Sequence, residues 1–273
     1  NGYCIVRSKV MLLMVACLVT GCSYFQGDEL AAPKYPKKEK TPLKARPDKD
    51  KAKTLTELGT AYYQQGKYEY ALENLERALE LDDKSGFTYQ TLALIQVRKS
   101  HPEQARKFFL TAMQLAPEDM NILTNYAVFL YGNNEKDAAL VEFKKVVASP
   151  FYGNKWTALT YLGRYDLKNK QQRAAEKNFY YALRNNPNYA PALIEMAKIR
   201  YAKAEMMSAR GFIERYFSHT GQIKPLEGLI LAIKIERGLG DTKMVANYQL
   251  ELTRTYPFSD AAEQIKYNKT VTQ

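Results

Sequence analysis

Residues 156–189, WTALTYLGRYDLKNKQQRAAEKNFYYALRNNPNY, carry the pattern that decides the fold. Ala175, Phe179 and Ala182 are spaced four and three residues apart, so they share one stripe of a helix. Small side chains let a second helix approach closely, and the ring between them fills the remaining gap. Gly163 lies on the preceding helical stretch, and Pro187 follows the second one, where a proline stops a helix. The segment therefore predicts two short helices that pack on each other.

The same stripe recurs along the chain every 34 residues, with one shift of two residues. Its positions are Ala71, Leu75 and Ala78; Ala105, Phe109 and Ala112; Ala139, Phe143 and Val146; Ala175, Phe179 and Ala182; and Ala209, Ile213 and Tyr216. A fixed period of this length is typical of helix–turn–helix repeats, which bury their apolar faces against their neighbours. The residues resemble the tetratricopeptide-repeat signature, which implies an all-α solenoid wound as a right-handed superhelix. Chance periodicity in an unrelated helical bundle is disfavoured because the match recurs in at least four units.

We expect six units, at residues 52–85, 86–119, 120–153, 156–189, 190–223 and 226–257. The shift falls at residues 149–154, where Pro150 and Gly153 break the helix. The sixth unit replaces most of the small residues, as expected of a terminal, capping repeat. Residues 258–273 are expected to form a capping segment with one further helix and a tail.

The first 21 residues have the plan of a secretory signal peptide. Two basic residues precede an apolar run at residues 10–19, which is too short to cross a bilayer as a helix. VTGC at residues 19–22 resembles a bacterial lipobox, which implies a mature chain that begins at a lipidated Cys22. An ordinary cleaved signal and an uncleaved anchor are the alternatives. Ser23 is similar to the residue found after the lipidated cysteine in lipoproteins exported to the outer membrane.

Residues 22–51 are interpreted as the lipidated cysteine followed by a disordered tether, because lysine and proline dominate and apolar residues are few. Cys4 and Cys17 precede the cleavage point, so Cys22 is the one cysteine of the expected mature chain. A disulfide, a thiol nucleophile and a cysteine-based metal site are therefore not expected.

Charge and motif content argue against catalysis and nucleic-acid binding. The formal net charge of +11 becomes +9 when Arg7 and Lys9 leave with the signal peptide, which favours an acidic partner surface or membrane proximity. His101 and His219 belong to no metal-ligand spacing, and no nucleophile elbow, P-loop or dinucleotide fingerprint is present. We expect no enzyme activity, no metal, no small-molecule substrate and no cofactor other than the lipid on Cys22.

In tetratricopeptide arrays the first helices of successive units line a concave face, where a partner would bind. Unit positions 2, 5, 6, 9, 12 and 13 point inward, and our candidates at or near these positions are Tyr63, Gln64, Gln90, Asn125, Tyr131, Arg164, Lys168, Lys198 and Tyr201. Asn125 offers a donor and an acceptor to an extended peptide. For each tyrosine, packing within the array is as good an interpretation. Unit one has Thr56 and Thr60 where some arrays carry a basic clamp for a C-terminal carboxylate.

A closer resemblance extends over the whole expected array and the lipobox. The chain resembles the type IV pilus biogenesis and stability lipoproteins, the pilotins of six tetratricopeptide repeats. The segments that carry it include KNF at 177–179, IERY at 213–216, IERGLGD at 235–241 and YPFS at 256–259, together with Asn125, Tyr126, Phe129, Leu130 and Pro187. The places of two cysteines common in that family are taken by Tyr131 and Tyr165, so its inter-repeat disulfide is not expected here.

The resemblance implies a noncatalytic assembly factor on the periplasmic face of the outer membrane. Pilotins of this kind promote localisation and multimerisation of the secretin, the ring through which the pilus emerges. Two alternatives stay open, a β-barrel assembly lipoprotein and an adaptor for a periplasmic peptidase or cell-wall enzyme. IERGLGD and the Lys/Pro-rich tether argue against the first of these.

Overall fold

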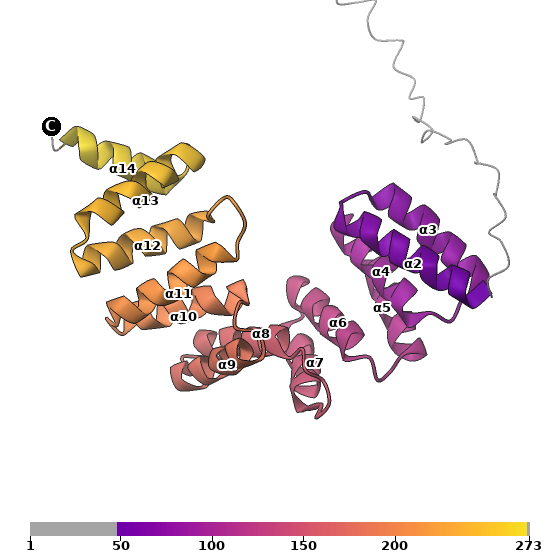
Figure 1. The fold of residues 1–273 in the computed structure, drawn as a ribbon. Coiled ribbons are helices and arrows are strands. Elements are labelled where there is room, and N and C mark those ends of the chain that lie inside the picture. Colours follow the sequence, from indigo (N-terminus) through magenta and orange to yellow (C-terminus); the bar gives the residue numbers. More distant parts are fainter. Residues whose placement is uncertain (1–47, 272–273) are drawn as a thin grey trace, which may run out of the picture. The chain divides into compact units, whose positions relative to one another are not determined.

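The computed structural model describes residues 48–271. The predicted signal peptide, Cys22 with its lipid, and the tether as far as residue 47 lie outside the described residues. Within residues 48–271 the chain forms thirteen α-helices and no strand, so the predicted all-α repeat fold is confirmed (Figure 1). None of the helices in this part of the chain has the length and apolar character needed to cross a membrane.

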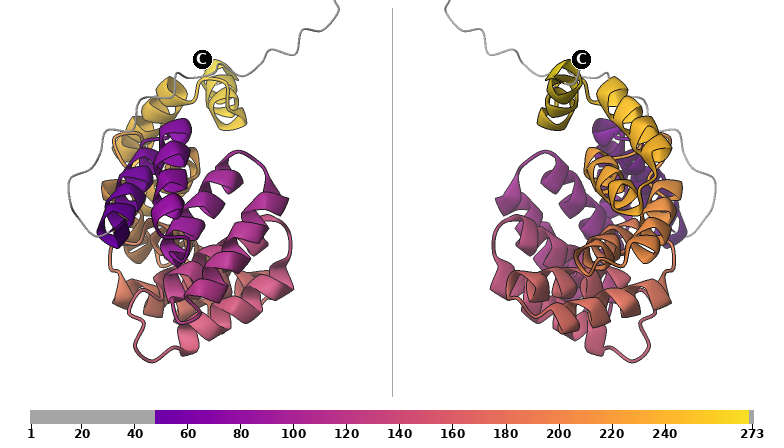
Figure 2. Two further views of the ribbon diagram at one scale, coloured as in Figure 1. Left: turned by 90° about the vertical axis from the view of Figure 1, so that its right-hand side faces the viewer. Right: turned by 90° about the vertical axis from the view of Figure 1, so that its left-hand side faces the viewer.

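The helices form six antiparallel pairs, one within each predicted unit, followed by a final helix. The pairs are α2 Asp48–Gln64 with α3 Tyr68–Leu81, α4 Gly86–Arg98 with α5 Pro102–Leu115, α6 Met120–Gly132 with α7 Lys136–Ala148, α8 Trp156–Lys168 with α9 Gln172–Asn185, α10 Ala190–Ala202 with α11 Met206–Ser218, and α12 Leu226–Leu239 with α13 Thr242–Thr255. The final helix is α14 Asp260–Val271. The two helices of each pair pack against each other (Figure 2).

The start of α2 differs from the sequence-based expectation. The predicted tether extends to residue 51, whereas α2 begins at Asp48. Asp48 and Asp50 lie in its first turn, where their carboxylates interact favourably with the positive end of the helix dipole. Lys51 Nζ also lies 3.1 Å from Asp48 Oδ1. Residues 48–51 are therefore helical rather than part of the tether.

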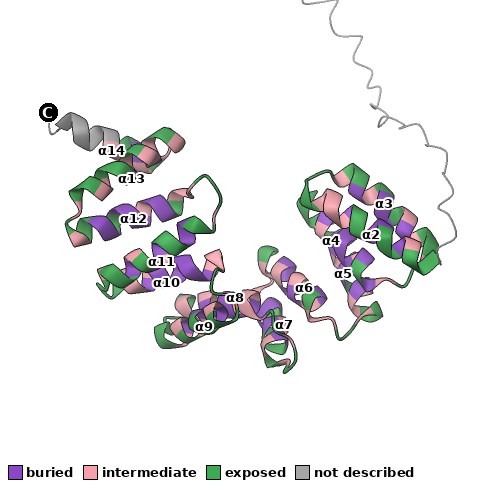
Figure 3. Cartoon of the chain, viewed as in Figure 1, coloured by how far each residue is buried: buried purple, intermediate pink, exposed green. Residues whose placement is uncertain are grey.

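The repeated stripe forms the core of the first five units. Phe109, Phe143 and Phe179 are fully buried, and so are the alanines around them (Figure 3). The facing helix needs a small residue where it contacts the ring. A Cβ added to Gly163 would lie 2.7 Å from the Phe179 ring, closer than carbon atoms can pack. The periodic pattern in the sequence is thus the pattern of close contacts between the two helices of a repeat.

The turn inside each repeat requires one residue in the left-handed region of backbone space. Its φ is +74° at Gly66 and +74° at Gly240, where glycine adopts it without a steric penalty. The same turn position is occupied by non-glycine residues in the four middle repeats, at Ser100, Asn134, Lys170 and Ala204. These four turns therefore carry backbone strain that the packing of the repeat sustains.

Neighbouring repeats are joined by ion pairs at most of their interfaces. Glu69 pairs with Lys99 at 3.1 Å, Arg106 pairs with Glu135, and Glu176 pairs with Arg200 and Lys203. Within residues 48–271 no ion pair joins the third and fourth repeats. That interface is aromatic.

Tyr161 of the fourth repeat stacks on Phe143 of the third, with ring centroids 4.8 Å apart. It also meets Tyr131 edge-on at 4.8 Å. The change of register at residues 149–154 therefore coincides with a change in the chemistry of the interface.

Candidate partner-binding surfaces

All nine predicted groove residues lie on first helices, from α2 to α10, but they differ in exposure. Gln64 and Lys168 are exposed, Gln90 is buried, and the remaining six are half-buried: Tyr63, Asn125, Tyr131, Arg164, Lys198 and Tyr201. No partner is present to define a binding face, so these residues remain candidates. Their contacts within the array separate those that are engaged in packing from those that are not.

Gln90 is the clearest departure from expectation. Its side chain is only 6% exposed, so it does not line an open groove. Its Oε1 is buried and has no hydrogen-bond partner within the described residues. Gln90 is therefore not available to a partner in this arrangement.

Arg164 and Lys198 belong to a charge-matched row that crosses three first helices. Arg164 Nε of α8 donates to Glu195 Oε1 of α10 at 2.8 Å, and Lys198 Nζ lies 3.5 Å from Glu195 Oε2. Lys198 also pairs with Glu227 of α12. Glu195 is buried, so its two cations compensate a carboxylate that would otherwise be costly to bury. The row holds repeats four to six together, and its cations are not free charges.

The sequence contained a signal for this row. Glu195 occupies position 6 of the fifth unit, one of the inward positions, and follows Arg164 by 31 residues. A search for opposite charges at inward positions of successive units would have found the pair. Our candidates included the cations and omitted the carboxylate.

Hydroxyl groups make an analogous contact between the first two repeats. The Oγ1 atoms of Thr56 and Thr88 lie 2.7 Å apart, and those of Thr60 and Thr91 lie 3.3 Å apart. The two threonines at the clamp positions thus join α2 to α4.

The three candidate tyrosines also take part in packing. Tyr63 lies beside Tyr68, with ring centroids 6.2 Å apart, and its hydroxyl raises the pKa of Arg98 through a hydrogen bond. Tyr201 packs against the core of the last repeats, and Tyr131 against Tyr161. Among the half-buried candidates, Asn125 has a side chain that makes no hydrogen bond to any described residue. It keeps both its donor and its acceptor for a partner.

A second surface lies at the N-terminal end of the array. Leu58 of α2 is 43% exposed. Tyr62 lies one turn further on the same helix and contacts Tyr70 of α3, with ring centroids 5.5 Å apart. Tyr70 is 57% exposed, and Lys67 Nζ lies 5.9 Å from the centre of the Tyr62 ring. We call these four residues the N-terminal end patch.

The patch exists because no repeat in the described chain precedes α2. Leu58 is the seventh residue of its unit, and the corresponding residues of the next five units are buried or half-buried: Leu92, Tyr126, Leu162, Met196 and Ala232. In those units the preceding repeat covers this position. Comparing position 7 across the units would have identified the patch from the sequence.

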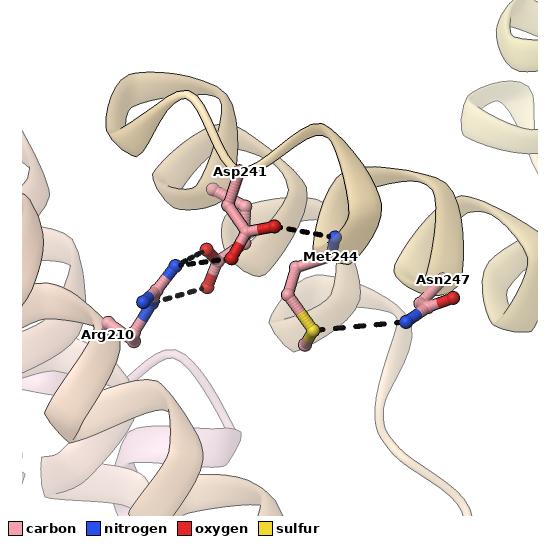
Figure 4. Close-up of polar contacts among 5 residues, drawn as sticks. Arg210, Asp241, Met244 and Asn247 are labelled. Carbon is pink, nitrogen blue, oxygen red and sulfur yellow. Dashed lines mark hydrogen bonds and ion pairs between the residues drawn. The ribbon is translucent and has the colours of Figure 1, made fainter.

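The IERGLGD segment has a structural role at the other end of the array (Figure 4). Arg210 Nε of α11 donates to Glu236 Oε1 at 2.9 Å, and Arg210 Nη2 lies 3.3 Å from Asp241 Oδ2. Asp241 also caps α13, because its Oδ1 accepts a hydrogen bond from the Met244 amide at 3.0 Å. Gly240 supplies the left-handed residue of the turn. The segment joins the fifth repeat to the sixth and caps the start of α13, the second helix of the last pair.

Comparison with known proteins identifies the repeat family and a relative of similar length. The family model for the tetratricopeptide repeat matches residues 52–85, the first unit. With its six helix pairs, the chain has the tetratricopeptide-repeat fold. It is 27% identical to the type IV pilus assembly protein PilF of Pseudomonas aeruginosa over 265 residues, which is 97% of this chain and 99% of PilF.

Solved structures agree with this relationship. The structure of Pseudomonas aeruginosa PilF matches 82% of this chain and all of its own chain, with a TM-score of 0.72 and 25% identity. PilW, a widely conserved type IV pilus biogenesis factor, matches 78% of this chain and 97% of its own, with a TM-score of 0.64 and 25% identity. The chain is thus a homologue of type IV pilus biogenesis proteins, which confirms that resemblance. The repeat fold and these relatives indicate a scaffold for protein–protein interaction.

Proposed function

We propose that the protein is a pilotin, a noncatalytic lipoprotein that promotes localisation and multimerisation of the type IV pilus secretin. The observation that carries the proposal is the homology to PilF over nearly the full length of both chains. A match confined to one repeat would support only a generic interaction module, because repeats of this kind serve many functions.

In this proposal Cys22 carries the lipid and places the protein on the periplasmic face of the outer membrane. The tether lets the array reach a secretin subunit near the membrane. Unassembled secretin subunits expose apolar surface and strand edges, which are prone to aggregate. A scaffold that covers such surface until the ring closes would raise the yield of the multimer.

The N-terminal end patch is the surface we assign to the secretin. It combines apolar area with two tyrosines, a composition that protein interfaces favour. Leu58 and Tyr70 are exposed there, whereas most of the groove candidates are engaged within the array. Asn125 is a second point of contact, for an extended backbone.

The test is the amount of heat-resistant secretin multimer in membrane fractions. We expect deletion of the protein to leave monomeric secretin, and Cys22→Ala to leave the secretin mislocalised. Leu58→Glu with Tyr70→Glu should reduce the multimer several-fold at equal protein level. The matched control is Tyr180→Glu, because Tyr180 on α9 is 54% exposed and lies outside the patch.

An unchanged multimer in the deletion strain would exclude the secretin role. Barrel-assembly and cell-wall partners would then be sought by crosslinking. A normal multimer in the patch variant alone would reject the patch and leave the role intact.

A further inference from the structure

The loop between the third and fourth repeats presents an aromatic ring to water. Phe151 is 98% exposed, and Pro150 beside it is also exposed. The next residue holds the loop in place, because Tyr152 Oη donates to Asn121 Oδ1 at 2.9 Å. The loop is therefore fixed to the array at Tyr152, but the neighbouring side chain of Phe151 remains exposed.

Lysines flank this ring in the sequence, and carboxylates are absent from the same stretch. Residues 143–159 contain Lys144, Lys145 and Lys155 and no Asp or Glu. Residues 180–193, around the end of α9, contain Arg184 and again no Asp or Glu. The nearest acidic residue before the loop is Glu142, which pairs with Lys145 at 2.9 Å.

The two basic stretches lie at the same edge of the array. Thr157, two residues beyond the loop, has its Oγ1 3.2 Å from Tyr189 Oη at the start of the next repeat. This hydrogen bond joins the first turn of α8, which follows the loop, to the residue before α10, which follows the end of α9. Arg184, near the end of α9, therefore lies at the same edge of the array as the three lysines.

The corresponding turns of the first repeats have the opposite character. Residues 111–124, around the turn after α5, contain Glu118 and Asp119 and no Lys or Arg. The turn after α3 contains Asp82 and Asp83 beside one lysine, Lys84, so carboxylates also predominate there. The edge formed by the turns between repeats is acidic in its first half and basic with an exposed ring in its middle.

We propose that residues 149–155 contact the surface of a lipid bilayer that contains anionic phospholipids. Phe151 enters the boundary between headgroups and acyl chains, while Lys144, Lys145, Lys155 and Arg184 face the phosphates. Cations beside inserted aromatic rings are the usual chemistry of peripheral membrane contact. The interaction does not depend on the pilus role or on the lipid at Cys22.

The size of the apolar contact favours a bilayer over a protein. A stable protein interface buries about 800 Å² on each partner around an apolar centre. Here the apolar part is a single exposed ring, flanked in the sequence by long cationic side chains. A fluid surface accommodates such a ring without a complementary pocket, and anionic headgroups match the charge of its surroundings.

The experiment measures the depth of residue 151 in vesicles with a tryptophan probe. Trp156 is the single tryptophan of the chain, so Trp156→Phe gives a background without intrinsic probe. The full chain with Trp156→Phe and Phe151→Trp is added to phosphatidylethanolamine/phosphatidylglycerol vesicles whose acyl chains carry bromine. We expect a blue shift of the emission and quenching by at least two-fold.

The matched control is Phe87→Trp in the same background. Phe87 is 45% exposed and lies in the first turn of α4, at the acidic half of the same edge. Any attachment through the N-terminal segment is identical in both proteins. A difference in quenching therefore reports which part of the array faces the bilayer. We expect no quenching at position 87.

A second pair of variants tests the charge. Lys144→Glu with Lys145→Glu, in the Phe151→Trp background, should abolish most of the quenching, and so should vesicles of phosphatidylcholine alone. Equal quenching at positions 151 and 87, or none at 151, would overturn the proposal. Helical content measured by circular dichroism confirms that each variant is folded before it is scored.

Discussion

Glu236 of α12 is 1% exposed, and both of its carboxylate oxygens are bonded to Arg210 of α11 in the preceding repeat. The same bonds hold the pKa of Arg210 above its usual value, with Glu236 as the largest cause and Asp241 as a further one. A buried carboxylate is tolerated in a core only when such a partner is present. Of the charged contacts that join the last two repeats, this one contains a buried carboxylate, so removal of Arg210 alone leaves an uncompensated charge in the core.

Replacing Arg210 by methionine should destabilise the protein by about 3 kcal/mol, because the Glu236 carboxylate is left buried without its partner. The free energy of unfolding, measured with urea, checks this. Arg106→Met is the comparison, since its partner Glu135 has a side chain that is 40% exposed. Its expected cost is at most about 1 kcal/mol. Similar losses in both variants would show that the burial of Glu236 does not matter.

Gly163→Ala tests the close approach inside the fourth repeat. The added Cβ would lie 2.7 Å from the Phe179 ring, which is itself fully buried and has little room to move. Overpacking of this kind costs about 1–3 kcal/mol. Gly132→Ala is the control, because a Cβ at Gly132 meets nothing within 4 Å. Thermal unfolding should give a lower midpoint for the first variant and an unchanged or higher one for the second.

Ala204→Gly should stabilise the protein, although glycine usually weakens a helical repeat. Ala204 has a φ of +58°, in the left-handed region. Relief of that strain contributes about 1–2 kcal/mol, whereas the extra freedom of glycine in the unfolded chain costs about 0.4–1 kcal/mol. The net gain is on the order of 0.5 kcal/mol. A decrease in the denaturant midpoint would show that the turn holds Ala204 without strain.

Much of the fold could be predicted from the sequence because the physical constraint is itself periodic. Ala71, Ala105 and Ala139 are all fully buried, and the larger residue four positions after each one fills the same place in its unit. One period of close helix contacts thus produces one period in the sequence. The start of α2 was missed because its first residues, 48–51, are lysines and aspartates and have the composition of a tether.

The candidate surfaces were harder to predict because they depend on contacts between repeats. Whether Lys198 is a free cation depends on Glu195 and Glu227, and the second of these lies in another repeat. The exposure of Leu58 likewise depends on the absence of a preceding repeat in the described chain, not on Leu58 itself. Inward direction alone selected residues such as Gln90, whose side chain is buried.

The ion pairs between the fourth and fifth repeats should give the stability a defined dependence on pH. Glu176 binds Lys203 and Arg200, and these contacts, the hydrogen bond from Lys203 first, lower its pKa from the ordinary value of 4.5. A carboxyl group with a lower pKa in the folded state stabilises the protein fully above its unfolded pKa. This contribution is lost as the pH falls through the folded pKa.

Glu176→Gln should therefore cost at most about 1 kcal/mol at pH 7, as expected of a partly exposed network. The difference from wild type should shrink steadily below pH 4.5, where the wild-type carboxyl group becomes protonated. Lys203→Met should reproduce part of this effect, and the double variant should cost less than the sum of the two. Urea titrations between pH 3 and 7 measure all three. A difference between wild type and Glu176→Gln that is as large at pH 3 as at pH 7 would assign the loss to packing, because a protonated carboxyl group no longer attracts its cations.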